Sequence, residues 1–401
     1  MEHLLFLTQR IPYPPDKGDK IRSWRILQHL ARRYHVHLGC FYDAPEDARH
    51  IPFLETVCAS VCCVPLRPAL ARWRSLKGLV RREALTLGYF EDARLQRWVD
   101  ALVRAHAPSQ VFVFCSAVAP YAINHRAARR IIDLVDVDSE KWGQYAQSRP
   151  WPLSAVYARE QRKLLAFERR IASAFDGTLL ASSAEAELFR RLAPEAAARV
   201  HAMPNGIDAA FFDPDRDYPN PFPRLAPAVV FTGAMDYWPN IQAATWFARE
   251  AVPLIRRRWP SLEFWIVGAN PVAAVRRLGG DGIVVTGRVD DIRPYLAHAA
   301  AVVAPLWIAR GVLNKVLEAM AMAKPMVATP EACEGIEVAQ GEAVLTARTA
   351  PEFADRVHAI LAGEQKQLGV RARQCVLTQH RWDFAVLDRL MGEACEVAAA
   401  G

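Results

Sequence analysis

The segment 304–328 contains the residues best suited to binding a phosphorylated ligand. Its pattern predicts a strand, a short loop that carries Arg310 and Gly311, and a helix that begins directly after the loop. The first N–H groups of a helix lie at the positive end of its dipole and favour an anion. Lys315 and Glu318 are three residues apart and share one face of this helix. We therefore expect a phosphate site here. The simpler alternative is that both cations are solvated and that Glu318 forms an ordinary salt bridge.

Two acids, Asp136 and Asp138, follow a predicted buried strand at 130–135. A carboxylate at a strand end is suited to take a proton from a hydroxyl group as a general base. The alternative is that the acids cap the following loop and pair with Lys141. The pair also fits an Asp-x-Asp metal-binding pattern. We expect no metal, however, because the pair lies in the other half of the chain from the predicted phosphate site.

Short β-branched and aromatic runs alternate with helical patterns along the whole chain, which is typical of βαβ units and predicts an α/β fold. Strands are predicted at 4–8, 36–41, 60–64, 110–114, 130–135, 177–181, 199–203, 228–232, 263–267, 283–286, 301–304 and 326–328. Helices are predicted near 21–33, 68–82, 91–105, 154–174, 183–192, 240–257, 271–278, 311–323 and 350–362.

The length of 401 residues is two to three times that of a typical domain. Proline and glycine residues punctuate 204–227 and indicate a linker. We therefore predict two doubly wound, Rossmann-like domains, 1–203 and 204–380, that face each other across a cleft holding the site. A C-terminal helix within 381–401 is expected to pack on one of them, with the N-terminal domain as a candidate.

The composition is that of a globular protein, with 52% hydrophobic and 23% charged residues, which excludes disordered and collagen-like classes. No apolar run approaches the ~20 residues of a membrane span, and the first residues do not resemble a signal peptide. A cytoplasmic location is therefore expected. The eight cysteines are scattered through apolar segments without histidines at zinc spacing, so we expect buried free thiols.

Positive charge is concentrated in the first half of the chain. Residues 1–203 hold 30 Lys and Arg against 21 Asp and Glu, a net of +9, and the remainder hold 20 against 22, a net of −2. This asymmetry predicts an anionic partner, such as a membrane surface or a phosphorylated acceptor. Nucleic acid is not expected, because no nucleic-acid-binding motif accompanies the charge.

One basic segment, 66–82, has six basic residues and no acidic ones. A helical wheel places an apolar stripe that includes Trp73 between the cations, which favours peripheral contact with an anionic membrane. The alternative is that the stripe packs on the N-terminal sheet and the cations are solvated.

The segment 304–328 resembles the donor-binding motif of nucleotide-sugar glycosyltransferases of the GT-B fold, in particular family 4. In that family a Glu is followed after seven residues by a second Glu and Ala-Met-Ala. Here Glu318 to Ala321 and Pro325 match, whereas Arg310 stands at the first Glu position. Further matches follow in the family's order, at 8–22, 204–208, 231–240, 266–268 and 287–291. With 133–142, they resemble the sugar transferases encoded with exosortase (PEP-CTERM) exopolysaccharide clusters of Gram-negative bacteria.

The resemblance implies roles for the residues of the 304–328 segment. Glu318 would hold the ribose hydroxyl groups of the donor. The backbone amides of Gly311, Val312 and Leu313 would hold its distal phosphate. Arg310 would face the diphosphate or a substrate anion, because it replaces the Glu that contacts the sugar in the family.

Other family loops also imply donor contacts. Gly18 would lie near the donor phosphates, and an ordinary loop is the alternative there. Gly233, Asn240 and Gly268 would border the nucleotide, with Asn240 capping a helix. Arg288, Arg310 or Lys315 would neutralise the diphosphate.

The resemblance implies a retaining glycosyltransferase that acts in exopolysaccharide biosynthesis on a lipid-linked or oligosaccharide acceptor. The nucleotide-diphosphate sugar would be a co-substrate, so neither a cofactor nor a metal is expected. Asp138, Asp136, Lys315 and Arg310 are the catalytic candidates. Two alternatives remain. One is a catalytically degenerate scaffold subunit, suggested by Arg310 and by the lack of a histidine near Asp138. The other is a non-hydrolysing nucleotide-sugar epimerase.

Overall fold

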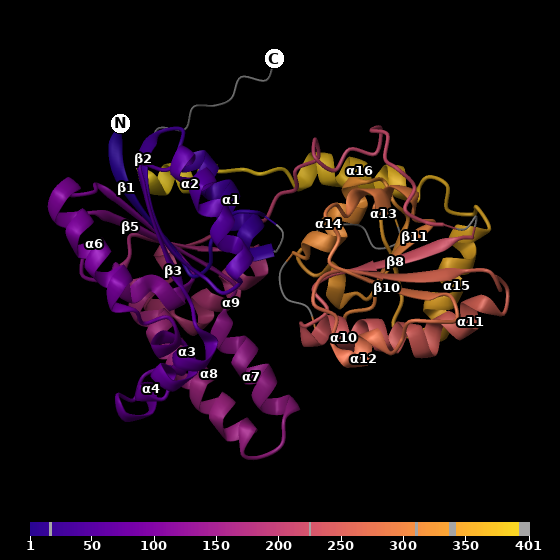
Figure 1. The fold of residues 1–401 in the computed structure, drawn as a ribbon, viewed down its shortest axis with the longest axis horizontal. Coiled ribbons are helices and arrows are strands. Elements are labelled where there is room, and N and C mark those ends of the chain that lie inside the picture. The colour runs from indigo at the N-terminus through magenta and orange to yellow at the C-terminus, as the bar shows by residue number, and fades with distance from the viewer. Residues whose placement is uncertain (16–17, 224–225, 309–311, 337–341, 393–401) are drawn as a thin grey trace. The chain divides into compact units, whose positions relative to one another are not determined.

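The computed structural model describes residues 1–401 except 16–17, 224–225, 309–311, 337–341 and 393–401 (Figure 1). The chain divides into two compact units. Met1–Met203 and Asp383–Gly401 form the N-terminal unit, and Pro204–Trp382 forms the C-terminal unit. In each unit helices cover a parallel sheet. The predicted α/β class with doubly wound sheets is thereby confirmed.

The sheet of the N-terminal unit has the strand order β3-β2-β1-β4-β5-β6-β7, and neighbouring strands pair in parallel. Its strands are β1 (Glu2–Thr8), β2 (Tyr34–Tyr42), β3 (Ser60–Pro65), β4 (Gln110–Phe114), β5 (Arg129–Val135), β6 (Gly177–Leu180) and β7 (Val200–Ala202). The central strand β4 is buried along its whole length. Parallel strands covered on both faces consist of continuous apolar residues, which is why the sequence pattern locates them well.

Two hydrophobic clusters lie on the two faces of this sheet. The helices of this unit are α1 (Gly18–Leu30), α2 (Ile51–Val57), α3 (Pro68–Ser75), α4 (Lys77–Val80), α5 (Leu85–Tyr89), α6 (Ala93–His106), α7 (Asp138–Ser148), α8 (Leu153–Ala174), α9 (Ser183–Leu192) and α17 (Ala385–Met391). Helices α6, α8 and α9 contribute to one cluster, and α1, α2 and α17 contribute to the other. The C-terminal helix α17 buries Leu387, Leu390 and Met391 in the second cluster, together with Leu4 and Ile131.

The C-terminal unit has the strand order β10-β9-β8-β11-β12-β13. Its strands are β8 (Ala228–Thr232), β9 (Glu263–Val267), β10 (Ile283–Gly287), β11 (Ala301–Ala304), β12 (Met326–Ala328) and β13 (Leu345–Thr346). Its helices are α10 (Trp238–Trp246), α11 (Val252–Arg256), α12 (Ala273–Arg276), α13 (Arg293–His298), α14 (Asn314–Ala321), α15 (Ala350–Leu361) and α16 (Leu368–Gln379). None of the helices among the described residues is long and apolar enough to cross a membrane.

Two predicted helices are interrupted. The predicted helix 68–82 is wrong as a single element, because α3 ends at Ser75 and α4 begins at Lys77. At the break, the hydroxyl of Ser75 donates to the carbonyl of Arg72, and the N–H of Leu76 donates to the carbonyl of Trp73. Side-chain bonds of this kind compete with helix propagation. The predicted helix 240–257 contains a π-helical turn, Phe247–Ala251, between α10 and α11.

Candidate functional site

The topology of the C-terminal unit makes one edge of its sheet a candidate ligand site. Strands β8 and β11 are neighbours, although β9 and β10 lie between them in sequence. Doubly wound sheets bind ligands at the carboxyl ends of strands beside such a switch point. Gly233 directly follows β8, and the loop that leads to α14 follows β11. The two predicted donor loops therefore begin at the strand ends that this topology favours.

Gly233 and Gly268 bring the ends of β8 and β9 into direct contact. Their φ angles are +152° and +154°, a region that L side chains rarely adopt. A Cβ on Gly268 would lie 1.7 Å from the carbonyl oxygen of Gly233. A Cβ on Gly233 would lie 2.8 Å from Nζ of Lys315. Only glycine fits at either position, so close approach of the backbone is built into this edge.

Lys315 on α14 contacts residues of α10 and β8. Its Nζ donates a hydrogen bond to Oδ1 of Asn240 at 2.7 Å. It also lies 4.6 Å from the centre of the Phe231 ring, within the range of a cation–π contact. The Nδ2 of Asn240 donates to the carbonyl oxygen of Ala234 at 2.9 Å, so its other amide atom faces the ammonium group. The ammonium is thus held beside Gly233.

The predicted capping role of Asn240 is wrong. Tyr237 is the N-cap of α10, without a side-chain hydrogen bond, and Asn240 is the third residue of the helix. Because the helix begins earlier than the sequence pattern suggested, the Asn240 side chain is buried and connects the loop after β8 to α14 instead.

Burial brings the pKa values of Lys315 and Glu318 together. It lowers the pKa of Lys315 to about 7, an effect that Glu318 opposes. It raises the pKa of Glu318 to about 7, an effect that Lys315 opposes. The charges of both groups therefore respond to small changes near neutral pH. An anionic ligand beside Lys315 would favour its ammonium form.

Of the other predicted donor residues in the C-terminal unit, Arg288, Val312 and Leu313 are described and two fall outside the described residues. Val312 is buried, and Leu313 is the N-cap of α14, which no side-chain hydrogen bond caps. Arg288 is exposed directly after β10. Arg310 and Gly311 lie outside the described residues.

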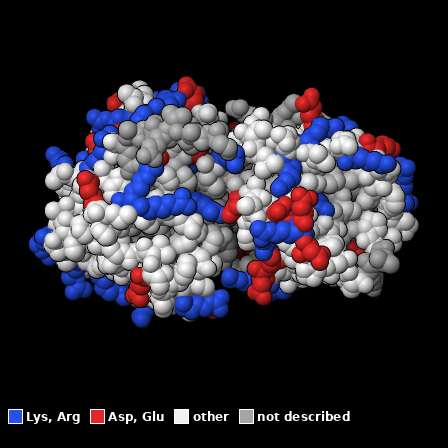
Figure 2. All heavy atoms as spheres, turned by 90° about the horizontal axis from the view of Figure 1, so that it is seen from above, with Lys and Arg blue, Asp and Glu red and all other residues white. Residues whose placement is uncertain are grey.

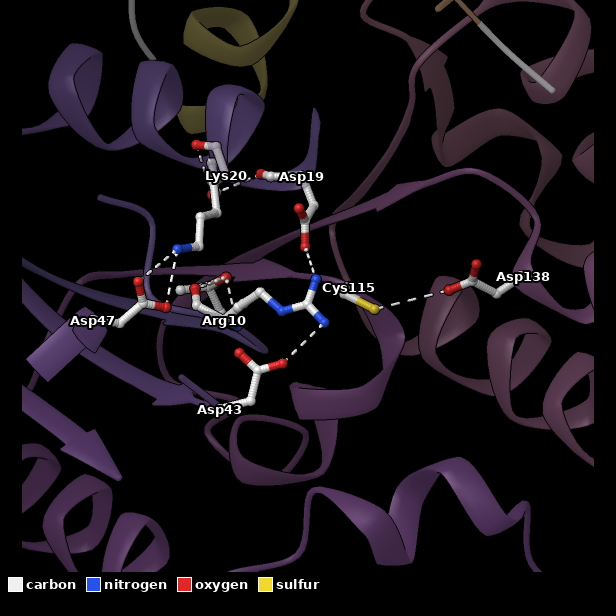
Figure 3. Close-up of polar contacts among 9 residues, drawn as sticks. Arg10, Asp19, Lys20, Asp43, Asp47, Cys115 and Asp138 are labelled. Carbon is white, nitrogen blue, oxygen red and sulfur yellow. Dashed lines mark hydrogen bonds and ion pairs between the residues drawn. The ribbon is translucent and has the colours of Figure 1, made fainter. Parts of the chain in front are cut away.

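A second group of polar side chains gathers at the carboxyl ends of the strands in the N-terminal unit (Figure 3). The switch point of this sheet lies between β1 and β4. After β1, Arg10 forms ion pairs with Asp19 at 2.8 Å and Asp43 at 3.5 Å. Lys20 is buried and pairs with Asp47 at 3.0 Å. These acids therefore neutralise the charges of Arg10 and Lys20. The ion pairs were not predicted from the sequence.

Helix α1 begins at Gly18, and its residue Arg22 is buried. Arg22 and Asp133 are 1% and 0% exposed, and Nε of Arg22 donates to Oδ2 of Asp133 at 2.7 Å. Burial raises the pKa of Asp133, and the Arg22 guanidinium opposes that rise. Removing either partner would leave a buried charge uncompensated. This pair is therefore part of the framework of the site.

Asp136 and Asp138 both pair with Lys141, at 2.8 Å and 3.0 Å. These two carboxylates raise the pKa of Lys141 well above its usual value, against the effect of burial. Figure 3 shows the side chains of Cys115 and Asp138 directed toward each other, with 3.9 Å between Cys115 Sγ and an Asp138 carboxylate oxygen. The ion pairs match the structural alternative raised from the sequence. The catalytic roles of both acids stay predictions.

Glu168 on α8 forms hydrogen bonds with the first turn of α7. It is buried, and its carboxylate oxygens accept hydrogen bonds from the Ser139 N–H at 3.2 Å and hydroxyl at 2.6 Å. Burial raises the pKa of Glu168 to about 8. This residue was not among those predicted from the sequence. Its signal was an acid within the apolar stripe that includes Leu164 and Ile171, at helical spacing.

The charge asymmetry is visible on the surface. On the face shown in Figure 2, Lys and Arg side chains are more widespread than acids over the left-hand, N-terminal unit. Both signs are interspersed on the C-terminal unit. This distribution agrees with the net charges counted from the sequence.

Solved structures with the same architecture define the fold. Sucrose-phosphate synthase from Thermosynechococcus elongatus has a TM-score of 0.67 at 16% identity, covering 98% of this chain and 96% of its own. Anabaena Alr3699/HepE in complex with UDP and glucose has a TM-score of 0.67 at 16% identity, covering 98% of both chains. An α,α-trehalose-phosphate synthase from Burkholderia vietnamiensis has a TM-score of 0.61 at 13% identity, covering 97% of this chain and 100% of its own. The fold is therefore GT-B, as predicted.

Residues 226–363 match the family model "Glycosyl transferases group 1". The matched range includes β8 to α15 and the predicted donor residues of the C-terminal unit. The predicted enzyme class, glycosyltransferase, is confirmed. No curated protein matched the chain.

Proposed function

We propose that this chain transfers a sugar from a nucleotide-diphosphate sugar to a lipid-linked or oligosaccharide acceptor, with retention of anomeric configuration, in exopolysaccharide biosynthesis. The observation that carries the donor assignment is the Lys315 ammonium, which Asn240 holds beside Gly233 at the switch point of the C-terminal sheet. The complexes of Anabaena Alr3699/HepE with UDP and with UDP-glucose support a uridine donor as the first to test.

Each donor-side residue has a part in this proposal. The backbone at Gly233 and the uncapped start of α14 would lie against the diphosphate. Lys315 would neutralise charge as the diphosphate leaves, and Glu318, one turn further along α14, would accept hydrogen bonds from the ribose hydroxyl groups. Because a preorganised cation and helix N-terminus supply this stabilisation, the reaction should not need a metal ion.

The acceptor is proposed to bind at the N-terminal unit. The carbon–oxygen bond from the sugar to the diphosphate breaks, and a bond from that carbon to the acceptor oxygen forms on the same face. The hydroxyl proton passes to Asp138 or to the leaving diphosphate. Lys141 holds Asp138 in place through their ion pair, so turnover depends on how the acceptor alters this pair.

The donor assignment is tested with UDP, GDP and ADP in a thermal-shift series on the full chain. Ligand at about 100 times its dissociation constant adds about 2.7 kcal/mol to the free energy of unfolding. The matching sugar nucleotide is then incubated with and without acceptor in the presence of EDTA. We expect one nucleotide to stabilise the protein and to be released as transfer proceeds. Failure of all three to bind would refute the donor site.

The same assay separates the alternatives. Binding without release of nucleoside diphosphate under any acceptor would indicate a scaffold subunit. Inversion at a sugar carbon without an acceptor would indicate an epimerase. Loss of activity in EDTA that Mg²⁺ restores would contradict the metal-independent mechanism.

We propose a peripheral membrane contact through α3 and α4. The apolar side chains of Leu70, Trp73, Leu76, Leu79 and Val80 are exposed, Trp73 by 73% and Val80 by 88%. These five side chains therefore do not pack on the sheet, whereas Leu66 of the same predicted stripe is buried against it. Five exposed cations, Arg67, Arg72, Lys77, Arg81 and Arg82, lie in the same segment. Tryptophan beside cations suits the headgroup region of an anionic bilayer.

Co-sedimentation with anionic and neutral liposomes tests this contact. Changing the exposed residues Arg67, Arg72, Lys77 and Arg81 to Glu should abolish salt-sensitive binding to anionic vesicles, because each cation contributes about 1 kcal/mol there. The matched control changes Arg257, Arg258, Arg276 and Arg277 of the C-terminal unit to Glu, which alters the net charge equally. Equal pelleting of both variants would exclude α3 and α4 as the contact.

A further inference from the structure

Three histidines meet in the N-terminal unit, toward the strand ends opposite those that carry Asp136 and Arg10. His3 is the second residue of β1, His37 lies in β2, and His106 is the last residue of α6. One possible ligand atom from each lies within 4.8 Å of the others. His37 is buried, His3 is partly buried and His106 is exposed. None of them belongs to the proposed transfer site.

The backbone makes this meeting a fixed feature of the fold. β1 and β2 pair in parallel, with His3 opposite His35 and Leu5 opposite His37. Alternate residues of a strand point to the same face, so His37 lies on the face that His3 and His35 share. Leu5, Leu95 and Leu102 pack in one hydrophobic cluster, which brings α6 onto this face (Figure 1). His106 at the end of α6 then reaches the two strand histidines.

The distances suit a shared ion. Nδ1 of His3 and Nε2 of His37 are 2.9 Å apart. The ring of His106 lies 4.7 Å from that of His3 and 4.9 Å from that of His37, between centroids. Zinc–nitrogen bonds of ~2.0–2.1 Å in a tetrahedral site place ligand nitrogens about 3.3 Å apart. The observed pair is already close to this spacing, and a rotation of the exposed His106 side chain brings in the third nitrogen.

A second hydrogen bond orients the buried ring. Nδ1 of His37 lies 2.7 Å from Oγ of Ser60 on β3. Metal-bound histidines commonly use their other ring nitrogen in such a bond, which fixes the tautomer and the ring plane.

We propose that His3, His37 and His106 bind a zinc-class divalent transition-metal ion, with water completing a tetrahedral shell. Imidazole nitrogen is a preferred ligand of such ions and a poor one for Mg²⁺ or Ca²⁺. The ion would join β1, β2 and α6. Its role would be to stabilise the N-terminal unit rather than to take part in transfer, so it can be tested without an activity assay.

The test uses the full chain without a polyhistidine tag, stripped of metal by a chelator. Zn²⁺ is titrated in competition with a chromophoric chelator, and Co²⁺ is titrated by its visible absorption. We expect one equivalent of Zn²⁺ per chain and a tetrahedral cobalt spectrum without a thiolate charge-transfer band. His106→Ala should weaken binding at least about 100-fold, and Ser60→Ala about 10- to 100-fold.

The matched control is His35→Ala, which removes an exposed histidine of the same strand that is not one of the three ligands. It should bind Zn²⁺ within about threefold of the wild-type chain. Circular dichroism should show that His106→Ala keeps its fold, because this side chain is exposed. The proposal is overturned if the wild-type chain binds no stoichiometric Zn²⁺ or if His106→Ala binds it equally well. A thiolate band would overturn it too, since it would indicate Cys40 and Cys63, whose sulfur atoms are 3.2 Å apart.

Discussion

Replacing Lys315 by methionine should change donor affinity and stability in different directions. The lowering of the Lys315 pKa from 10.5 to about 7 corresponds to roughly 5 kcal/mol of unfavourable charging, an upper bound because the side chain is only partly buried. Methionine removes this cost but leaves Oδ1 of Asn240 without its donor, at about 1–3 kcal/mol. We therefore expect Lys315→Met to unfold in urea at a free energy equal to or above that of the wild type.

Affinity for the nucleoside diphosphate should fall in the same variant. A hydrogen bond from a charged group is worth about 1.5–3 kcal/mol, which corresponds to about ten- to a hundredfold in the dissociation constant. Isothermal titration calorimetry measures this change directly. Lys324→Met is the matched control, because burial also lowers the pKa of Lys324 while its Nζ donates to the carbonyl of Ala297 instead. If Lys315→Met and Lys324→Met both bind within twofold of the wild type, the ammonium does not contact the phosphates.

Four further predictions concern the two proposed sites. Affinity for inorganic pyrophosphate should decline as pH rises above about 7, because Lys315 loses its proton there, and calorimetry at pH 8 in two buffers should show proton uptake on binding. Glu318→Gln should weaken nucleoside diphosphate binding about tenfold more than pyrophosphate binding, which falls only because Glu318 no longer raises the pKa of Lys315; equal losses for both ligands would contradict contact of Glu318 with the ribose. Asp138→Asn should reduce turnover at saturating acceptor far more than Asp136→Asn, and wild-type turnover would make Asp138 structural. The pKa of Glu168 is raised from 4.5 to about 8, so between these two pH values the folded chain holds a proton that the unfolded chain has lost. The contribution of Glu168 to the free energy of unfolding therefore falls as pH rises from 4.5 to about 8. Urea unfolding of Glu168→Gln at pH 5, 7 and 9 should lack this decline, and a decline equal to that of the wild type would assign the pH dependence to other groups.

Strands were predictable from the sequence because burial on both faces leaves unbroken apolar runs. The predicted limits of β4, β8, β9, β11 and β12 agree with the structure. The two-residue strand β13 is too short to produce such a run. Helix α7 was not predicted, because its first residue, Asp138, belongs to an acidic segment that is typical of a loop.

The site was less predictable, because its contacts join residues far apart in sequence. Asn240 and Lys315 are separated by 75 positions, and nothing local to either indicates their hydrogen bond. The close contact of Gly233 with Gly268 likewise depends on the pairing of β8 with β9. The resemblance placed the glycines and the helix correctly along the chain, whereas the orientation of the Asn240 side chain followed only from where α10 begins.

The position of α17 affects how the chain folds during its synthesis. Leu390 packs against Gly177 so closely that a Cβ on Gly177 would lie 2.9 Å from Cδ1 of Leu390. The carbonyl of Met391 accepts a hydrogen bond from the side chain of Gln110. These residues are synthesised after the whole C-terminal unit, yet they belong to the core of the unit that is made first. The C-terminal unit is continuous in sequence and can finish folding earlier, although domains usually fold in their order of synthesis. Until α17 emerges, the nascent N-terminal unit therefore lacks the apolar side chains that pack with Leu4 and Ile131.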